Sequence, residues 1–471
     1  MTRTAKRIAV IGGGISGVAA AYQLAVVRQK QSFDWALFEA SDRLGGIVET
    51  RRSHGFVMEG GPDSWVTEKP WARDLATELG LADQIIPSND NRRRTYLLEG
   101  DRLIAMPDGM RMMVPTDLEA LNGSPLFSEE ALQAYHREPQ RAEELKSTAA
   151  VAREDESVAS FVLRHFGREV ADKLAGPLLA GVFGGNIDKL SVRAVMPAFV
   201  KMEREHGSLI TALQRHARST SAPVFTTLAS GLGTLVDSMA AIFPGDLVRL
   251  KTNVTVIEPK SGGWKISWPA GNENFDAVIV ATPAHVTRKL LAPLDPRFDS
   301  LLAMDATSAI VVALAFTAEQ ARDIDVPEGF GFLIPQRHDQ AATTSLLACT
   351  FVHQKFDHRA PEGAVLLRGF FGGEAAPALM NESDAALIAR TREQLSRVLG
   401  NLPDTEETLV RRWPRSLPQY GVGHQERMAE LEARTRLFSG LLLVGNAYHG
   451  VGLPDLIRDG RAAASSLINA L

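Results

Sequence analysis

Short apolar runs that end in glycine or proline recur along the chain and predict buried β-strands. Residues 7–11 (RIAVI) and 275–283 (FDAVIVATP) are two of them, and residues 441–450 (LLLVGNAYHG) run directly into glycine. Residues 35–40 (WALFEA) form another apolar run, which ends in Glu39. Continuous apolar runs of this kind are typical of parallel strands that are covered on both faces. The sequence therefore predicts an α/β fold in which both ends of the chain contribute to one parallel sheet.

A second group of strands is expected to form a separate sheet. Its members are residues 310–316, 329–335, 345–352 and 364–371. Residues 95–107 (TYLLEGDRLIAMP) alternate between apolar and polar positions, which suggests a hairpin. We also expect a strand pair within residues 247–259 and a further strand at residues 265–268.

Helical spacing of apolar residues replaces alternation in the first half of the chain. Ser157 is expected to cap a helix whose apolar residues recur at helical spacing up to Phe166, and Gly167 is expected to end it. The charge-dense residues 127–156 before it predict exposed helix and connector. A helical block should continue to about residue 220, and the small residues of 173–186 (KLAGPLLAGVFGGN) suit close packing or a cavity wall.

Three glycines follow the first predicted strand in the pattern Gly12-x-Gly14-x-x-Gly17. Gly12 permits a tight turn, Gly14 lets backbone approach a pyrophosphate, and Gly17 lets the following helix pack close to the strand. The N-terminus of that helix then offers free N–H groups to phosphates. Glu39 ends the next strand about 20 residues beyond the last glycine, where a carboxylate accepts hydrogen bonds from ribose hydroxyls. Strand, glycines, helix, strand and acid together predict a dinucleotide site.

The loop after Glu39 favours FAD as the dinucleotide. It carries Arg43 and the pair Gly45-Gly46, which suit a second set of contacts to a bound pyrophosphate, whereas a plain surface loop is the alternative interpretation. The sequence contains no second glycine motif of this type for a nicotinamide cofactor. We therefore expect electrons to arrive from the substrate and to leave to oxygen or another diffusible acceptor.

Composition narrows the range of functions. The chain has 471 residues, too many for one core, so two or three structural units are expected. A formal net charge of -5 gives no overall attraction for nucleic acid. The single Cys349 excludes an intramolecular disulfide and suits a reducing compartment. No segment approaches the ~18 apolar residues of a membrane span; the nearest, residues 301–316, predicts a buried strand, while peripheral membrane contact stays open.

These segments together resemble the FAD-dependent amine-oxidase-like superfamily and, within it, the porphyrinogen oxidases of haem biosynthesis. The general part of the likeness is GGGISG, FEASDRLGG, FDAVIVATP and GNAYHGVGLPDLIRDG. The particular part lies in residues 59–65, 166–194, 229–239, 328–335 and 411–424. The segment GPDSWVTEK (61–69) is similar to the soluble bacterial type, for which coproporphyrinogen III is a known substrate.

The resemblance implies a Rossmann-like FAD-binding domain with an inserted substrate-binding sheet domain and a helical domain. The expected division is residues 1–85 for the first part of the FAD-binding domain, 86–225 for the mostly helical domain on the membrane or substrate side with its connector, 226–290 for the second FAD-binding part, 291–425 for the substrate-binding sheet domain, and 426–471 for the C-terminal FAD-binding part. It also implies an activity: the oxidation of protoporphyrinogen IX or coproporphyrinogen III by repeated hydride transfer to flavin N5, with oxygen as acceptor and release of hydrogen peroxide.

The resemblance also carries site residues over to this chain. The cofactor-binding residues that it implies are Gly12, Gly13, Gly14, Ile15, Ser16, Gly17, Glu39, Ala40, Arg43, Gly46, Gly61, Pro62, Asp63, Ser64, Val254, Trp413, Val451, Gly452 and Leu453. The implied substrate-binding residues are Asp63, Lys69, Phe330, Gly331, Leu333 and Phe370. No side chain is singled out as catalytic, because flavin N5 would accept the hydride. Which cation receives a propionate is left open between Arg94 and Lys69, since the mitochondrial members carry an arginine near Thr95.

Other patterns in the sequence give weaker indications of a functional site. The run Arg92-Arg93-Arg94 is interpreted as a solvated loop rather than a phosphate-binding patch, although these residues, Lys69 and Arg368 are candidate cations for carboxylates. Cys349, His353 and His358 are expected to have structural roles, so no metal site is predicted. An amine oxidase or carotenoid-type desaturase is the alternative activity, and a non-catalytic protein like the GDP-dissociation inhibitors is a third.

Expected surroundings of the protein follow from the resemblance. They are a cytoplasmic location with peripheral membrane contact left open, ferrochelatase or another haem-pathway enzyme as a partner left open, no nucleic acid, and either a monomer or a homodimer.

Overall fold

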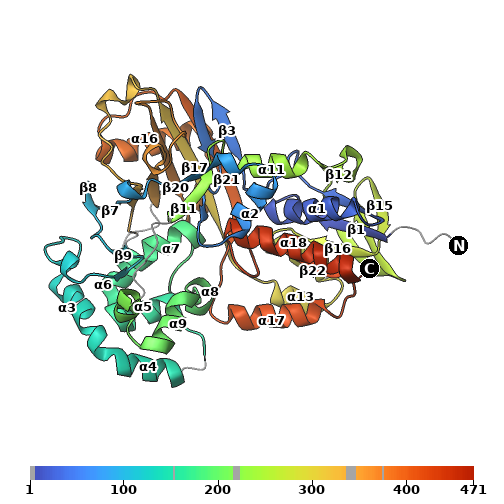
Figure 1. Ribbon diagram of the computed structural model, residues 1–471, viewed down its shortest axis with the longest axis horizontal. Coiled ribbons are helices and arrows are strands. Elements are labelled where there is room, and N and C mark those ends of the chain that lie inside the picture. The colour runs from blue at the N-terminus through green and yellow to red at the C-terminus, as the bar shows by residue number, and fades with distance from the viewer. Residues whose placement is uncertain (1–5, 152–153, 216–222, 336–345, 374–375, 471) are drawn as a thin grey trace.

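The structure has three parts, each with its own core (Figure 1). One part holds a parallel sheet and both ends of the chain, a second holds a larger mixed sheet, and a third is helical. The computed structural model describes residues 6–151, 154–215, 223–335, 346–373 and 376–470. Among these residues, no helix is long and apolar enough to cross a membrane.

The parallel sheet is assembled from distant segments of the chain. Its order is β12-β2-β1-β16-β22, and every neighbouring pair is parallel. The strands are β1 (Lys6–Ile11), β2 (Phe33–Phe38), β12 (Val248–Arg249), β16 (Ala277–Val280) and β22 (Leu441–Leu443). Ile8, Val10 and Ile279 are fully buried, as expected for strands covered on both faces. The prediction that both chain ends meet in one sheet is therefore confirmed.

Helices from both ends of the chain pack against this sheet (Figure 1). The bounds of those that surround it are α1 (Ile15–Arg28), α2 (Trp71–Glu78), α11 (Gly233–Ala240), α12 (Ala284–Leu291), α13 (Pro296–Leu301), α17 (His424–Thr435) and α18 (Leu453–Ala470). A Cβ atom on Gly460 of α18 would lie 2.2 Å from the carbonyl oxygen of Ser16 in α1. These two helices consequently touch backbone to backbone.

Smaller sheets connect the parts. They comprise β3 (Thr50–Ser53) with β4 (Phe56–Glu59); β5 (Trp65–Val66) and β6 (Ile85–Pro87) on either side of β11 (Phe225–Leu228); β9 (Met110–Arg111) with β10 (Val114–Pro115); and the meander β13 (Val256–Lys260), β14 (Gly263–Trp268), β15 (Gly271–Phe275). The expected strand pair in residues 247–259 is wrong: β12 joins the parallel sheet and β13 joins the meander, because the intervening backbone returns to Glu39, whose carbonyl accepts from Thr252 at 2.8 Å.

The larger sheet has seven strands in the order β21-β17-β20-β19-β18-β7-β8. The pair β18–β7 is parallel and the other pairs are antiparallel. The strands are β7 (Thr95–Glu99), β8 (Arg102–Ala105), β17 (Ala306–Phe316), β18 (Gly331–Leu333), β19 (Ala348–Phe351), β20 (Val365–Phe371) and β21 (Glu407–Pro418). The predicted hairpin at residues 95–107 and the strand predicted within 301–316 are confirmed. The hairpin joins this sheet although it lies in the segment 86–225 that was expected to be mostly helical.

One face of the larger sheet is covered by α16 (Asp384–Leu399). Leu387 and Leu395 of this helix belong to a buried cluster with Phe332 and Leu367 of the sheet. Part of the opposite face packs against Phe56 and Met58 of β4.

The helical part is built around a core of its own. Its helices are α3 (Glu129–Arg137), α4 (Ala142–Val151), α5 (Val158–Phe166), α6 (Arg168–Val170), α7 (Gly176–Phe183), α8 (Val192–Val195), α9 (Pro197–His206) and α10 (Leu209–Arg215), with a π-helical turn at Ala171–Ala175. Ser157 accepts from the N–H of Ser160 at 3.1 Å, and Gly167 follows α5 with φ of 85°. Both predicted ends of this helix are confirmed.

The remaining short elements are α14 (Val352–Lys355), α15 (Ala376–Leu379) and the single 3-10 turns Ala82–Gln84, Asp90–Arg92, Glu119–Leu121, Pro139–Arg141, Gly245–Leu247 and Gln320–Asp323.

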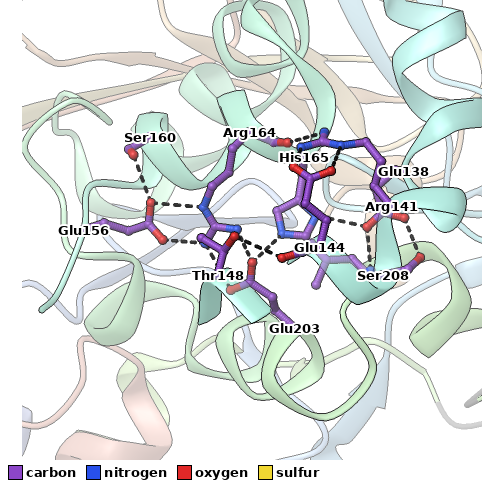
Figure 2. Close-up of polar contacts among 11 residues, drawn as sticks. Glu138, Arg141, Glu144, Thr148, Glu156, Ser160, Arg164, His165, Glu203 and Ser208 are labelled. Atoms are coloured by element: carbon purple, nitrogen blue, oxygen red, sulfur yellow. Dashed lines mark hydrogen bonds and ion pairs between the residues drawn. The ribbon is translucent and has the colours of Figure 1, made fainter. Parts of the chain in front are cut away.

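A buried polar network joins three helices of the helical part (Figure 2). His165 of α5 lies 3.0 Å from Glu138 through Nδ1 and 3.0 Å from Glu203 of α9 through Nε2. Both ring nitrogens can donate only when the imidazole carries two protons. Arg164 pairs with Glu203 and, on its other side, with Glu156 at 2.5 Å. We call Glu138, Glu156, Arg164, His165 and Glu203 the His165 network.

Candidate functional site

The three glycines after β1 have different surroundings. Gly12 has φ of 105°, and a Cβ atom there would lie 2.7 Å from the carbonyl oxygen of Ala281. A Cβ on Gly17 would lie 1.9 Å from the oxygen of Gly12. A Cβ on Gly14, by contrast, would meet no protein atom within 4 Å. Packing within the protein therefore requires glycine at the first and third positions, whereas the open space at Gly14 fits a ligand that approaches the backbone.

The N-terminus of α1 opens onto the same space. Gly14 is its N-cap, no side chain caps it, and its first turn has no acidic residue. Ile15 and Ser16, which begin the helix, are buried. Gly45 donates to the carbonyl of Gly13 at 2.7 Å, so the loop that carries Gly46 lies beside this turn. Uncapped N–H groups and the partial positive charge of the helix terminus suit the phosphates of a dinucleotide.

Glu39 closes the other side of this turn. Its carboxylate accepts from the backbone N–H of Gly13 at 2.6 Å and of Ser41 at 2.7 Å. Its backbone oxygen accepts from Thr252, two residues before the buried Val254. Ala40 is exposed beside it. Glu39, Ala40 and Val254, three of the implied cofactor-binding residues, thus gather at one edge of the parallel sheet, at the carboxyl ends of β1 and β2, where open α/β sheets bind ligands.

Arg43 links this loop to the larger sheet. Its guanidinium donates to the carbonyls of Gly46 and of Val48, lies 3.1 Å from Glu49, and is 5.8 Å from the ring centroid of Trp413. The indole N–H of Trp413 in turn donates to the carbonyl of Gly60 at 2.7 Å. Trp413 is therefore not an isolated core residue but part of the wall between the two sheets.

Gly61, Pro62, Asp63 and Ser64 form the next part of that wall. A Cβ on Gly61 would lie 1.8 Å from the oxygen of Ile47, so only glycine permits this close approach of two backbone segments. Pro62 is partly buried between Gly61 and Asp63. The hydroxyl of Ser64 donates to Asp63 at 2.8 Å.

Asp63 is held by two cations that sequence reasoning did not assign to it. Lys355 of α14 donates to both carboxylate oxygens at 3.0 Å, and Arg368 of β20 lies 3.2 Å away. Burial alone would raise the pKa of Asp63, but the charges of Lys355 and Arg368 bring that pKa well below its usual range. Asp63 is consequently an ionised carboxylate, and its low pKa makes it a weak base near neutral pH.

Arg368 is fully enclosed by this arrangement. Its side chain is 2% exposed, and its guanidinium also donates to the carbonyl of Gly61. It therefore helps to hold the wall in place, while its buried Nε has no hydrogen-bond partner among the described residues. A role for Arg368 as a cation for a substrate carboxylate stays a prediction. A second buried pair, Glu59 with Arg359 at 3.1 Å, lies in the same region.

The predicted residues Val451, Gly452 and Leu453 lie at the start of α18. Lys69 pairs at 2.5 Å with Asp455, a buried carboxylate in the first turn of this helix. Lys69 thus offsets the negative charge of Asp455 at the positive end of the helix.

Tyr420 and His424 fix the loop before α18 and were missed by sequence reasoning. The Tyr420 hydroxyl donates to the carbonyl of Asn446 at 2.7 Å and accepts from the N–H of Gly450 at 3.0 Å. The ring of His424 stacks on Tyr420 with centroids 3.9 Å apart. The motif RRWPRSLPQYGVGH contains both residues, but a single sequence offers no sign of their partners.

Strand register places some of the predicted substrate residues on one face of the larger sheet. Leu333 pairs with Ala348, which pairs with Phe370, so these three point to the same face. The next row on that face is Gly331, Thr350 and Arg368. This face is opposite to the one that α16 covers. Phe330, just before β18, is buried and donates its N–H to the carbonyl of Arg94 at 2.8 Å.

A cavity of about 1050 Å³ lies at the edge of this face, where Thr95 pairs with Gly331. Its apolar lining includes Met106, Met110, Met112, Leu178 and Phe225. Its charged lining comprises Arg73, Arg92, Arg93, Arg94, Arg111, Glu68, Asp90, Asp108 and Glu328. The candidate cations thus lie in three different places. The Arg92–Arg94 run lines the cavity, Lys69 pairs with Asp455, and Arg368 is buried with Asp63. None of the six predicted substrate-binding residues lines the cavity itself.

Cys349 and His353 have surroundings within the protein itself. Cys349 is buried in β19, and burial raises the pKa of its thiol. His353 lies 3.2 Å from the carbonyl of Leu366 through Nδ1. No cluster of three metal-ligating side chains exists among the residues that the structure describes.

Comparisons with known proteins agree over nearly the whole length of the chain. Residues 15–468 match the family described as flavin containing amine oxidoreductase. The coproporphyrinogen III oxidase of Bacillus subtilis is 33% identical, over 99% of this chain and 98% of the relative. The chloroplastic protoporphyrinogen oxidase 1 of Arabidopsis thaliana is 28% identical, over 94% of this chain and 84% of the relative. A solved structure from Exiguobacterium, provisionally named a protoporphyrinogen oxidase, has a TM-score of 0.83 and 30% identity over 99% of both chains. This chain therefore belongs to the family of flavin-containing amine oxidoreductases.

Proposed function

We propose that this protein is an FAD-dependent oxidase that converts a porphyrinogen to the porphyrin in haem biosynthesis. The single observation that carries the proposal is the full-length likeness to the coproporphyrinogen III oxidase of Bacillus subtilis. The open space at Gly14 and the uncapped start of α1 support FAD as the cofactor, because they fit a bound pyrophosphate. The alternative activities are less well supported. Putrescine oxidase shares the fold at only 18% identity and a TM-score of 0.67.

Bound FAD supplies the hydride acceptor, and molecular oxygen is the proposed final acceptor of the electrons. The protein's own residues hold and orient the two reactants. Glu39 would bind the ribose, the first turn of α1 the pyrophosphate, and Trp413 with Gly61 the wall beside the ring system. The start of α18 would direct N–H groups at the negative charge of the reduced flavin. Lys69 would offset the negative charge of Asp455 there.

The substrate has to be gripped on its flat apolar surface. Leu333 and Phe370 share the face of the larger sheet opposite α16 and would press on the macrocycle. Hydride transfer needs the reacting atoms within about 3–3.5 Å in correct alignment, so such walls contribute to rate through positioning. Because Asp63 is ionised and held by Lys355 and Arg368, its proposed role is to fix the wall.

Coproporphyrinogen III is the proposed substrate in preference to protoporphyrinogen IX. The relatives named coproporphyrinogen III oxidase from Bacillus subtilis and Staphylococcus aureus are 33% and 31% identical to this chain, whereas the chloroplastic protoporphyrinogen oxidase is 28% identical. We expect kcat/KM for coproporphyrinogen III to exceed that for protoporphyrinogen IX at least tenfold, which corresponds to about 1.4 kcal/mol of transition-state stabilisation. The appearance of porphyrin fluorescence measures both rates in one buffer. Equal values would overturn this preference.

Two simpler observations test the oxidase itself. The purified protein should be yellow with flavin absorption maxima. Anaerobic addition of a porphyrinogen should bleach the flavin, whereas amines should not. Bleaching by amines alone would support an amine oxidase instead. A colourless protein that takes up no FAD would support a non-catalytic binding protein.

The expected cytoplasmic location, peripheral membrane contact, ferrochelatase or another haem-pathway partner, and monomeric or homodimeric state stay predictions.

A further inference from the structure

Buried ion pairs beside Gly60 and Gly61 form a group of charges whose excess the proposed reaction has not used. Asp63 pairs with Lys355 at 3.0 Å and with Arg368 at 3.2 Å. Glu59, at the end of β4, pairs with Arg359 at 3.1 Å. We call these five residues the wall cluster: Glu59, Asp63, Lys355, Arg359 and Arg368.

The charges of the wall cluster do not balance. Its two carboxylates face two guanidinium groups, which stay protonated in proteins, and one ammonium group. Among the described residues, the ion pairs of these three cations end on Glu59 and Asp63 alone. Asp63 is ionised, whereas burial raises the pKa of Glu59, so any protonation of Glu59 would only enlarge the imbalance. The cluster therefore has an excess of at least one positive charge.

This excess is enclosed by protein. The side chains of Arg359, Arg368 and Lys355 are 1%, 2% and 12% exposed. The Nε of Arg368 is buried and has no hydrogen-bond partner among the described residues. The Lys355 ammonium lies 4.9 Å from the ring centroid of Phe225 and 5.1 Å from that of Phe356. Because an unpaired charge in such surroundings is unfavourable, the cluster fits an anionic group of a bound molecule.

A series of contacts connects the wall cluster to the glycine turn after β1. Arg43, whose loop lies beside that turn, is 5.8 Å from the ring centroid of Trp413. The indole of Trp413 donates to the carbonyl of Gly60 at 2.7 Å, and Arg368 donates to the carbonyl of the next residue, Gly61. A dinucleotide whose pyrophosphate lies at the turn would extend its ring system along this wall.

Other charges near the expected cofactor have negative partners of their own. At the start of α18, Lys69 pairs with Asp455 at 2.5 Å. Beside the glycine turn, Arg43 and Arg411 share Glu49, and the pyrophosphate itself would supply further negative charge there. The excess in the wall cluster is therefore the one that is left for the ring system.

We infer that the wall cluster, through the ammonium of Lys355, holds fixed positive charge beside the ring system of bound FAD and makes the flavin easier to reduce. Reduction adds electrons to the ring, and nearby positive charge favours the more negative state. Asp63 holds the ammonium in place before the reaction begins, so no reorganisation is needed. The inference rests on the proposed function, because it assumes that FAD accepts the electrons.

The test compares two substitutions that change the charge of the cluster in opposite directions. In substrate-free holoenzyme, Lys355→Met should lower the equilibrium constant for flavin reduction at least tenfold, about 30 mV for a two-electron couple. Asp63→Asn removes a negative charge with little change of shape and should raise that constant by a similar factor. Lys355→Arg keeps the charge and should stay within twofold of wild type. Anaerobic equilibration with a reference dye of known potential, followed by flavin absorbance, measures all three.

A matched control removes an ammonium group far from the wall. Lys6 pairs with Asp276 at 2.9 Å at the amino end of β1, opposite to the glycine turn. Lys6→Met should leave the equilibrium constant within twofold of wild type. Damage to the wall would move the two cluster variants in the same direction, so opposite shifts exclude a merely structural effect. If Lys355→Met retains no FAD, Asp63→Asn decides alone: a raised constant supports the inference and an unchanged or lowered one overturns it.

The outcomes separate this inference from the proposed function. A wild-type protein that takes up no FAD, or that holds FAD and oxidises no porphyrinogen, overturns the proposed function. If wild type is an active oxidase, shifts of equal sign in the two cluster variants, or no shift, overturn the inference and leave the function standing. A shift in Lys6→Met equal to that in Lys355→Met overturns it too, because general surface charge would then explain the effect. So does a lowered kcat/KM in Lys355→Met with an unchanged equilibrium constant, which would assign Lys355 to substrate binding instead.

Discussion

At the scale of single residues, Gly14 is required for FAD binding and not for packing within the protein. A Cβ there meets no protein atom within 4 Å, so Gly14→Val should fold normally while its side chain occupies the space of the pyrophosphate. We expect the purified variant to lack flavin absorbance and to bind added FAD at least tenfold more weakly. Gly181→Val is a matched control, because its Cβ is equally unobstructed in α7, and it should stay yellow. Normal FAD content in Gly14→Val would contradict the proposed cofactor site.

Two adjacent phenylalanines in β20 point to opposite faces of the sheet. Replacing one should therefore affect substrate turnover, and replacing the other should affect stability. Phe371 is 1% exposed in the core beneath α16, whereas Phe370 lies on the opposite face beside Ala348. Phe370→Ala should lower kcat/KM for the porphyrinogen by roughly tenfold or more with flavin still bound, because it removes apolar wall worth ~1.5–3 kcal/mol when buried. Phe371→Ala should mainly lower Tm, since it leaves a cavity in the core. A Phe370→Ala variant with altered Tm and unaltered kinetics would remove Phe370 from the substrate wall.

At the scale of elements, the His165 network connects α5, α9 and the turn after α3 through buried charges. Burial alone would raise the pKa of Glu203, but hydrogen bonds from His165 and Arg164 bring it below its ordinary value of 4.5. The unfolded chain therefore takes up a proton at Glu203 before the folded chain does as the pH falls. Its stabilising contribution is fully present above the ordinary pKa and is lost as the pH falls through the lowered one.

The corresponding prediction concerns Glu203→Gln. Removing one partner of a buried charge pair costs ~3–5 kcal/mol, so Tm at pH 7 should fall by several degrees. The difference from wild type should narrow as the pH is lowered below about 4.5. Glu205→Gln on the same helix is the control, because Glu205 is half exposed and pairs loosely with Lys201 at 3.8 Å. Tm of both variants is measured at several pH values. Equal decreases in Tm would show that the His165 network does not contribute to stability more than an exposed ion pair does.

At the scale of the whole molecule, the sequence predicted helices and strands whose signals lie in neighbouring residues. It missed contacts between residues that are distant in the sequence and that the fold brings together. The strand at residues 275–283 and the capped helix after Ser157 were predictable, because burial and capping leave periodic signals. The partners of Asp63 were not, since Lys355 lies 292 positions away and reaches it only through the order of the larger sheet. Arg368 was named from its charge alone, and the sequence did not indicate that it lies buried beside Asp63. The cofactor and substrate residues named from the resemblance stay predictions, to be tested by the variants above.

The order of assembly of the parallel sheet limits when the protein can acquire its cofactor during synthesis. The central β1 forms from the first residues, yet its sheet is completed by β22, and α1 packs against α18, which spans residues 453–470. At about 5–20 residues per second, a ribosome needs roughly half a minute or more to reach that helix. Until then, α1 exposes the apolar stripe that α18 later buries, and Gly12 to Gly17 lack their supporting neighbour. We therefore expect the glycine turn to gain the support that stable flavin binding requires only after α18 has been synthesised.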